Sequence, residues 1–259
     1  MLSYSRILKA CKIVFYGGPV QTYSQAKPLS LAKPSIRVDY LKKVMAWTSA
    51  GLFFSGLTGT MMAAFLYFSG LTFLLSPMVS LVVILGCFGL AQYVAPKMVF
   101  GQQKLAGFLM ANVAQGVAMG YLLLSAAIMG QVTSGSPFGL IGTALGLTAL
   151  TAGGMWVYVM SGPKDFSMLG GILSAFSLPM LVLMAIGFVA GPSMLGGVVG
   201  ILFYGVFVAF SAGALLYQVN IVIHKLRTDQ HIEGSYLISM GILILFWNIL
   251  SLLMSMSRD

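Results

Sequence analysis

Charged residues are scarce in this sequence. Only 7% of the residues are Asp, Glu, Lys or Arg, whereas 59% are hydrophobic. A soluble domain carries about a quarter charged residues because its surface faces water, whereas a surface that faces lipid needs no charge. The composition therefore excludes a water-soluble globular protein. At 259 residues, one membrane domain and a leader account for the chain.

Cysteine and histidine are also few. Cys11 and Cys87 are far apart in the sequence, which in practice excludes a disulfide framework. His224 and His231 have no Cys or carboxylate at a metal-ligand spacing, so we expect no metal site and no cofactor. The sequence has no nucleophile with a neighbouring base and no phosphate-binding loop. We therefore expect no catalytic residues and no enzymatic activity.

Long apolar runs make up most of the chain. A helix needs about 20 residues to cross the hydrocarbon core of a bilayer. Seven runs have this length, at 45–69, 78–96, 105–129, 138–160, 168–190, 194–223 and 235–256. The sequence thus predicts an all-α polytopic membrane protein with a seven-helix bundle. Its predicted parts are a basic leader at 1–44, the bundle at 45–256 and a C-terminal end at 257–259.

The basic residues indicate the orientation of the bundle. Thirteen of the fourteen Lys and Arg residues fall in the leader or in every second connection, and the connections between these carry no charge. Lys and Arg accumulate on the side from which insertion proceeds, so the alternation supports a count of seven helices. The same residues explain the net charge of +9 without nucleic-acid binding. We expect membrane lipids to surround the bundle.

The leader has an unusual composition. Residues 1–38 contain six basic residues, five serines and no acid. Such a composition is typical of a mitochondrial targeting segment, and Arg6, Lys9 and Lys12 form a basic stripe beside apolar side chains. The composition of the leader therefore favours a location in the mitochondrial inner membrane. The alternative is a basic tail held near anionic head groups, with the protein in the endoplasmic reticulum or a bacterial inner membrane.

Pairs of glycines four residues apart predict where helices pack closely. Each pair puts two glycines on one face of a helix, which lets a neighbouring backbone approach. The three pairs are Gly116 and Gly120, Gly142 and Gly146, and Gly196 and Gly200.

The most specific motif follows the fourth predicted span. A glycine-containing helix leads into a polar turn with Lys164, Asp165, Ser167, Leu169 and Gly170. This stretch resembles the Bax inhibitor-1 family, in which a similar helix runs into a Lys-Asp-Leu-Ser-x-Leu-Gly segment. The resemblance covers roughly residues 45–256 and implies a seven-helix fold. Together with the basic leader, the resemblance points to the mitochondrial growth-hormone-inducible transmembrane protein branch of this family.

The resemblance also points to a degenerate cation site. Family members that pass calcium or protons have an aspartate in the sixth helix, within Tyr-Asp-Thr-Gln, and another in the seventh. Here Gln218 and Asn248 stand at these positions, so polarity is kept and charge is lost. Amide oxygens are neutral and do not titrate, which argues against calcium binding. The two amides are able to hydrogen-bond each other across the bundle, and no acidic residue falls within a predicted span.

Two functions stay open. The neutral site favours a structural, assembly or regulatory subunit of a mitochondrial inner-membrane complex, with protein partners in that complex. The alternative is a calcium, proton or other cation channel or exchanger of the Bax inhibitor-1 type, working through carbonyl and amide oxygens. Calcium flux in reconstituted vesicles would discriminate between them.

Overall fold

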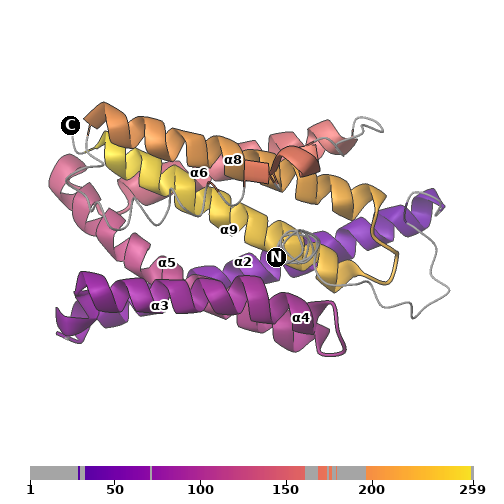
Figure 1. The fold of residues 1–259 in the computed structure, drawn as a ribbon, viewed down its shortest axis with the longest axis horizontal. Helices are drawn as coiled ribbons and strands as arrows, with labels where there is room; N and C mark the ends of the chain where they lie inside the picture. Colours follow the sequence, from indigo (N-terminus) through magenta and orange to yellow (C-terminus); the bar gives the residue numbers. More distant parts are fainter. Residues whose placement is uncertain are drawn as a thin grey trace, which may run out of the picture. The chain divides into compact units, whose positions relative to one another are not determined.

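The computed structural model describes residues 29, 33–70, 72–160, 169–173, 175, 176, 179 and 197–257. Six helices in this part of the chain are long and apolar enough to cross a membrane (Figure 1). They are Ser35–Phe68, Met78–Val99, Lys104–Thr133, Gly139–Met160, Val198–His224 and His231–Met256. The predicted all-α polytopic membrane protein is confirmed. The predicted fifth span at 168–190 falls largely outside the described residues, as does most of the leader.

The helices begin and end where the sequence contains proline, glycine or polar residues. Pro34 and Pro77 stand in the first turns of their helices, where a missing N–H costs nothing. Gly70 and Gly135 have positive φ angles of 64° and 68° in the turns after two long helices. In order, the elements are α2 (Pro34–Phe68), η2 (Thr72–Leu75), α3 (Pro77–Gly89), the π-helix η3 (Leu90–Val94), α4 (Ala95–Val99), α5 (Lys104–Ser134), α6 (Gly139–Met160), α8 (Gly197–His224) and α9 (His231–Met256).

Two helices start earlier than the apolar runs predict. α2 begins at Pro34, so the expected boundary between leader and bundle at residue 44 lies inside a helix. α9 begins at His231 rather than at 235. Charged residues end an apolar run but do not break a helix, which explains both differences. As a correction to the expectation that no acidic residue falls within a span, Asp39 and Glu233 lie within helices that are long and apolar enough to cross a membrane.

The chain divides into two compact units. Unit 1 comprises residues 1–120 and 221–240, and unit 2 comprises residues 121–220 and 241–259. Helices α5, α8 and α9 therefore contribute one part to each unit. Within unit 1, buried side chains of α2, α5 and the start of α9 form the core, with Val44, Phe108 and Ser235 fully buried.

Close packing of α2 on α5 in unit 1 follows from glycine. A Cβ atom on Gly120 would lie 2.6 Å from Met62 Cβ, and one on Gly116 would overlap the side chain of Thr58. Nearer the start of both helices, a Cβ on Gly51 would lie 2.7 Å from Phe108 Cζ. The residue numbers of the contacting positions increase together along both helices, so α2 and α5 run in the same direction. Gly116 and Gly120, the predicted packing face of α5, lie at this contact.

The other glycine pairs behave differently. A Cβ atom on Gly142 or Gly146 of α6 would meet no atom within 4 Å among the described residues. The described residues thus supply no neighbour for this pair, and its close packing stays a prediction. Gly200 is buried in unit 2, and Gly196 lies outside the described residues.

Candidate functional site

Gln218, the predicted sixth-helix position, lies half-buried on α8 in unit 2. Its Oε1 atom is buried and has no hydrogen-bond partner among the described residues. A Cβ atom on Gly241 of α9 would overlap this oxygen and would lie 2.9 Å from Leu215 Cδ1. Gly241 therefore provides the space that the Gln218 amide occupies.

The neighbouring Tyr217 connects this position to the family-like turn. Tyr217 is 3% exposed, and a Cβ atom on Gly170 would lie 2.6 Å from its Cζ atom. Its ring therefore packs directly on the backbone of Gly170, next to the half-buried Leu169. The other motif residues lie outside the described residues: Lys164, Asp165 and Ser167.

Asn248, the predicted partner of Gln218, is half-buried further along α9. It comes seven residues after Gly241, which is about 10.5 Å along a helix. Gln218 Oε1 faces Gly241, so the two amides do not form the hydrogen bond that the sequence allows. The physical reason is that α8 and α9 join through a short connection, which sets Gln218 against the first half of α9 and leaves Asn248 two turns away.

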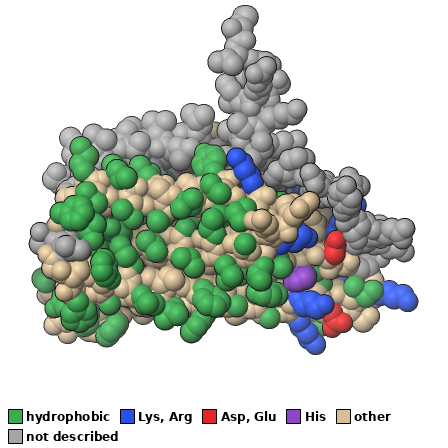
Figure 2. Space-filling view, turned by 90° about the horizontal axis from the view of Figure 1, so that it is seen from below, with side chains coloured by type: hydrophobic (Ala, Val, Ile, Leu, Met, Phe, Trp, Pro, Cys, Tyr) green, Lys and Arg blue, Asp and Glu red, His purple; other side chains and the backbone are tan. Residues whose placement is uncertain are grey.

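Charge is concentrated in unit 1. Figure 2 shows most of the basic, acidic and histidine side chains in one half of the view. Among the described residues, every Lys, Arg, Asp, Glu and His belongs to unit 1. These residues are Lys33, Arg37, Asp39, Lys42, Lys43, Lys97, Lys104, His224, Lys225, Arg227, Asp229, His231 and Glu233.

Glu233 is the buried charge in this group. It is 2% exposed and lies in the first turn of α9, where the helix dipole stabilises a negative side chain. Lys104, the first residue of α5, places its Nζ atom 2.7 Å from Glu233 Oε1. Glu233 Oε2 is also buried and has no hydrogen-bond partner in the described part of the chain. The ion pair therefore ties the starts of two helices together and leaves one carboxylate oxygen unpaired.

Hydrogen bonds fix α2 against the same turn of α9. The Tyr40 hydroxyl donates to the Gln230 carbonyl at 3.4 Å, a long bond, and the Ser235 hydroxyl lies 3.0 Å from the Val44 carbonyl oxygen. A Cβ atom on Gly234 would lie 2.9 Å from the Tyr40 hydroxyl oxygen, so glycine permits this approach. The described residues contain no group of three or more His, Cys, Asp and Glu side chains that could hold a metal ion.

The π-helix η3 has a local cause and a partner on α9. The Ala95 N–H donates to the Leu90 carbonyl, five residues back, so it does not reach the Ala91 carbonyl. The residue five positions after Ala91 is Pro96, which has no N–H. The Ala91 carbonyl therefore lacks a backbone donor, and the buried Tyr236 hydroxyl donates to it at 2.8 Å. This bond holds the α3–α4 segment against α9.

Sequence reasoning missed Glu233, although a signal was present. Gln230 precedes α9, its Oε1 atom accepts from the Arg227 N–H at 3.1 Å, and Glu233 follows three residues later. An acid in this position is typical of a helix start. The position was assigned to a connection because only the apolar run was counted.

The family model described as Inhibitor of apoptosis-promoting Bax1 matches residues 37–258. The chain belongs to the Bax inhibitor-1 family. The resemblance drawn from the turn at Lys164 to Gly170 is thus confirmed. The assignment to the mitochondrial branch of the family stays a prediction.

Two curated Bax inhibitor-1 relatives come from Escherichia coli. One, from strain K12, is called "Modulator of FtsH protease YccA", and the other, from a second strain, is called "Inner membrane protein YccA". Each is 31% identical to this chain over 141 residues, which is 54% of this chain and 61% of the relative. The chain thus matches about three fifths of the length of these relatives. No solved structure matches significantly.

Proposed function

We propose that this protein is a regulatory membrane subunit that binds a protease of the FtsH kind and changes its activity. The similarity to a relative named as a modulator of FtsH protease supports this proposal. The proposal specifies the subunit function that the sequence favours: the protein partner is a membrane protease.

The observation that carries the proposal is the neutral character of unit 2. None of its described residues is charged, and the position where the family has its sixth-helix aspartate holds Gln218, packed against Gly241. A fold that keeps its helix packing without an ionisable group there is suited to binding a partner more than to moving a cation.

We propose that the protein lies in the mitochondrial inner membrane. The acid-free segment 1–38 supports this location, whereas the relative named as an inner membrane protein of a bacterium fits the alternative, a bacterial inner membrane. Because α2 begins at Pro34, the leader is best tested without deletion. Changing Arg6, Lys9 and Lys12 to Gln should abolish mitochondrial import. Unaltered import of this variant would contradict the location, and so would finding the wild-type protein in the endoplasmic reticulum.

The function is tested by purification from native membranes in a mild detergent after crosslinking. A membrane protease should copurify with the wild-type protein, and its turnover of a membrane substrate should change when the protein is removed. The variant Gly142→Ala serves as a control for the copurification, because a Cβ atom at this position would meet no neighbouring atom within 4 Å among the described residues. Recovery of a lone monomer, with protease turnover unchanged on its removal, would overturn the proposal.

Cation transport is the second candidate, and one observation favours it. Glu233 is a buried carboxylate in a membrane helix, and such residues often belong to ion pathways. Calcium flux through the wild-type protein in liposomes, at acidic and at neutral pH, tests this candidate. We expect no pH-dependent flux. Robust pH-dependent calcium passage with Gln218 and Asn248 intact would put transport first.

A further inference from the structure

The charged end of unit 1 has a large surplus of positive charge. Its described residues include eight Lys and Arg side chains and three Asp and Glu side chains. One acid, Glu233, is buried and paired with Lys104. Seven basic residues therefore remain against the two exposed acids, Asp39 and Asp229. Five of the seven have exposed side chains: Lys33, Lys42, Lys43, Lys97 and Lys225.

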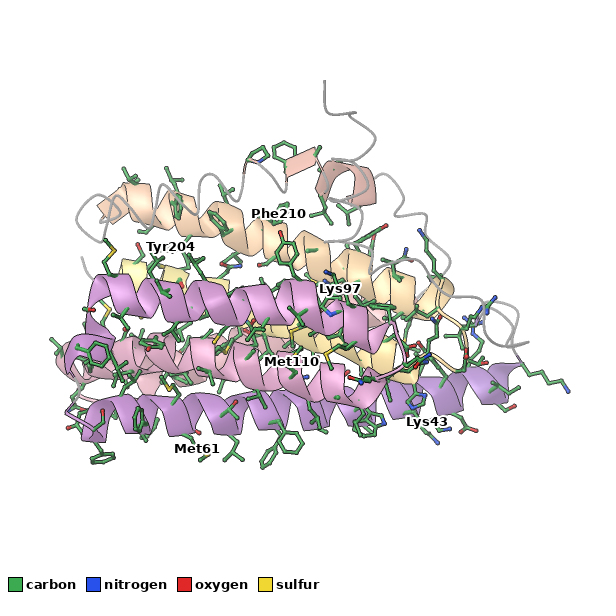
Figure 3. The ribbon with its side chains drawn as sticks, turned by 60° about the horizontal axis from the view of Figure 1, so that its bottom comes forward. Lys43, Met61, Lys97, Met110, Tyr204 and Phe210 are labelled. Carbon is green, nitrogen blue, oxygen red and sulfur yellow. The ribbon has the colours of Figure 1, made fainter. Side chains whose placement is uncertain are left out.

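Three segments distant in sequence bring these lysines to one end. The start of α2 is held to the α8–α9 connection by the bond from Tyr40 to Gln230. The end of α4 packs on α5, where a Cβ atom on Gly107 would lie 2.8 Å from Val99 N. Lys104 then joins α5 to α9. Figure 3 shows Lys43 away from Met61, with Lys97 between them and nearer the middle of the view.

The length of α2 places this end at the membrane surface. Its 35 residues extend about 52 Å, whereas the hydrocarbon core is about 30 Å thick and the bilayer with head groups is about 40–45 Å. At least one end of α2 must therefore reach the head-group layer. The start of α2 carries the charge, so Arg37, Lys42 and Lys43 are the residues that lie there.

Apolar and basic side chains are mixed on this part of α2. Ile36 is 46% exposed, Val38 is 50% exposed and Met45 is 53% exposed, and they alternate with the basic residues. Such a mixture suits the boundary between acyl chains and phosphates, because the apolar side chains enter the acyl region while lysines extend to the phosphates. An acidic protein segment would be attracted by the lysines but gives no reason for exposed apolar residues at a membrane boundary.

We propose that the charged end of unit 1 is a binding surface for anionic phospholipid head groups, with Lys42, Lys43 and Lys97 contacting the phosphates. The phosphate accepts hydrogen bonds from the lysine ammonium groups, and the acyl chains lie beside Ile36 and Val38. This surface is independent of the proposed regulation of a protease.

The test measures how much lipid the purified full chain retains. The protein is incubated in mixed detergent micelles with phosphatidylglycerol or with phosphatidylcholine, washed, and analysed by native mass spectrometry. We expect phosphatidylglycerol to be retained preferentially. In the variant Lys42→Gln, Lys43→Gln, Lys97→Gln this preference should fall at least tenfold, since each basic residue near an anionic surface strengthens binding roughly fivefold. The matched control, with the same three lysines changed to Arg, should keep the preference.

Three further measurements distinguish an anionic lipid from an acidic protein segment and from a soluble phosphate compound. Raising the salt concentration to 1 M should weaken phosphatidylglycerol retention by the wild-type protein, which tests the proposal even if the Gln variant fails to fold. Glycerol phosphate and polyglutamate are added separately as competitors. Equal retention of both lipids would overturn the proposal. Efficient displacement by polyglutamate would replace the lipid with an acidic protein segment, and efficient displacement by glycerol phosphate would indicate a site for soluble phosphate compounds.

Discussion

The two units place polar groups in their interiors in different ways. In unit 1 a buried carboxylate is paired with a lysine, and buried hydroxyl groups bond to the backbone of neighbouring helices. In unit 2 the amide oxygen of Gln218 is buried without a partner in the described residues. The difference teaches that polarity in a membrane helix does not by itself identify the site that holds the fold together. Glu233, Ser235 and Tyr236 of unit 1 join helices, whereas the Gln218 amide occupies space left by a glycine. Unit 1 also holds one buried amide, that of Gln115, without a hydrogen-bond partner in the described residues.

The largest expected effect comes from removing the counter-charge in unit 1. Lys104→Met should lower the free energy of unfolding by about 3 kcal/mol, because Glu233 is then left buried and unpaired. The estimate is at the low end of the range because Lys104 is 37% exposed. Unfolding in detergent with increasing denaturant measures this value.

The double variant Lys104→Met, Glu233→Met serves as the control for that measurement. It removes both charges and should recover most of the lost stability, since apolar residues of similar size often replace a buried ion pair without cost. If Lys104→Met alone left the unfolding free energy unchanged, the contrast between the two units would fail.

Glycine packing gives the next largest effect. Gly116→Ala should destabilise the protein by about 2 kcal/mol, because the new methyl group would overlap Thr58 and approach the Ser55 carbonyl. Gly142→Ala has open space in the described structure and should be neutral or slightly stabilising through its helix propensity. Thermal unfolding of the two variants, measured side by side, checks this. Equal changes in stability would mean that contact with a neighbouring helix does not determine the effect of a substitution at these glycines.

Removal of one hydroxyl group in unit 1 should cost about 1–2 kcal/mol. Tyr236→Phe leaves the buried Ala91 carbonyl without a donor. Tyr93→Phe changes the same atom at a residue that is 53% exposed and should have little effect. The difference in unfolding midpoint between the two variants reports the bond. Identical midpoints would show that Ala91 finds another donor.

The smallest effect is expected in unit 2. Gln218→Leu should change the unfolding free energy by less than about 1 kcal/mol, since the amide oxygen that it removes makes no hydrogen bond with the described residues. The denaturant midpoint measures this change. A loss as large as that of Lys104→Met would show that Gln218 has a structural partner and would remove the contrast between the units.

Composition and apolar runs were sufficient to predict an all-α polytopic membrane protein, because helices are the favoured way to satisfy backbone groups in lipid. A glycine pair permits the close approach of another helix, but the pair does not show which helix approaches. At Gly116 the neighbour is α2, whereas Gly142 has no neighbour among the described residues.

The interior polar groups were harder to predict. Glu233 lies outside an apolar run, and its burial depends on Lys104, which is 129 residues away in the sequence. Gln218 and Asn248 were paired because both stand at aspartate positions of the family, but the pairing of α8 with α9 sets Gln218 opposite Gly241. Contacts of this kind depend on how far one helix is shifted along another, and sequence patterns do not record that shift.

The π-helix η3 in the second span accommodates one extra residue without ending the helix. A turn closed over five residues instead of four carries one extra residue, so side chains after Val94 are rotated by about 100° relative to an uninterrupted α-helix. Lys97 lies in this rotated part. A chain that lost one residue between Leu90 and Val94 would keep its apolar length and its loops, yet would point Lys97 toward a different neighbour. The direction of the Lys97 side chain is thus set by the backbone phase of the segment that precedes it in the same helix.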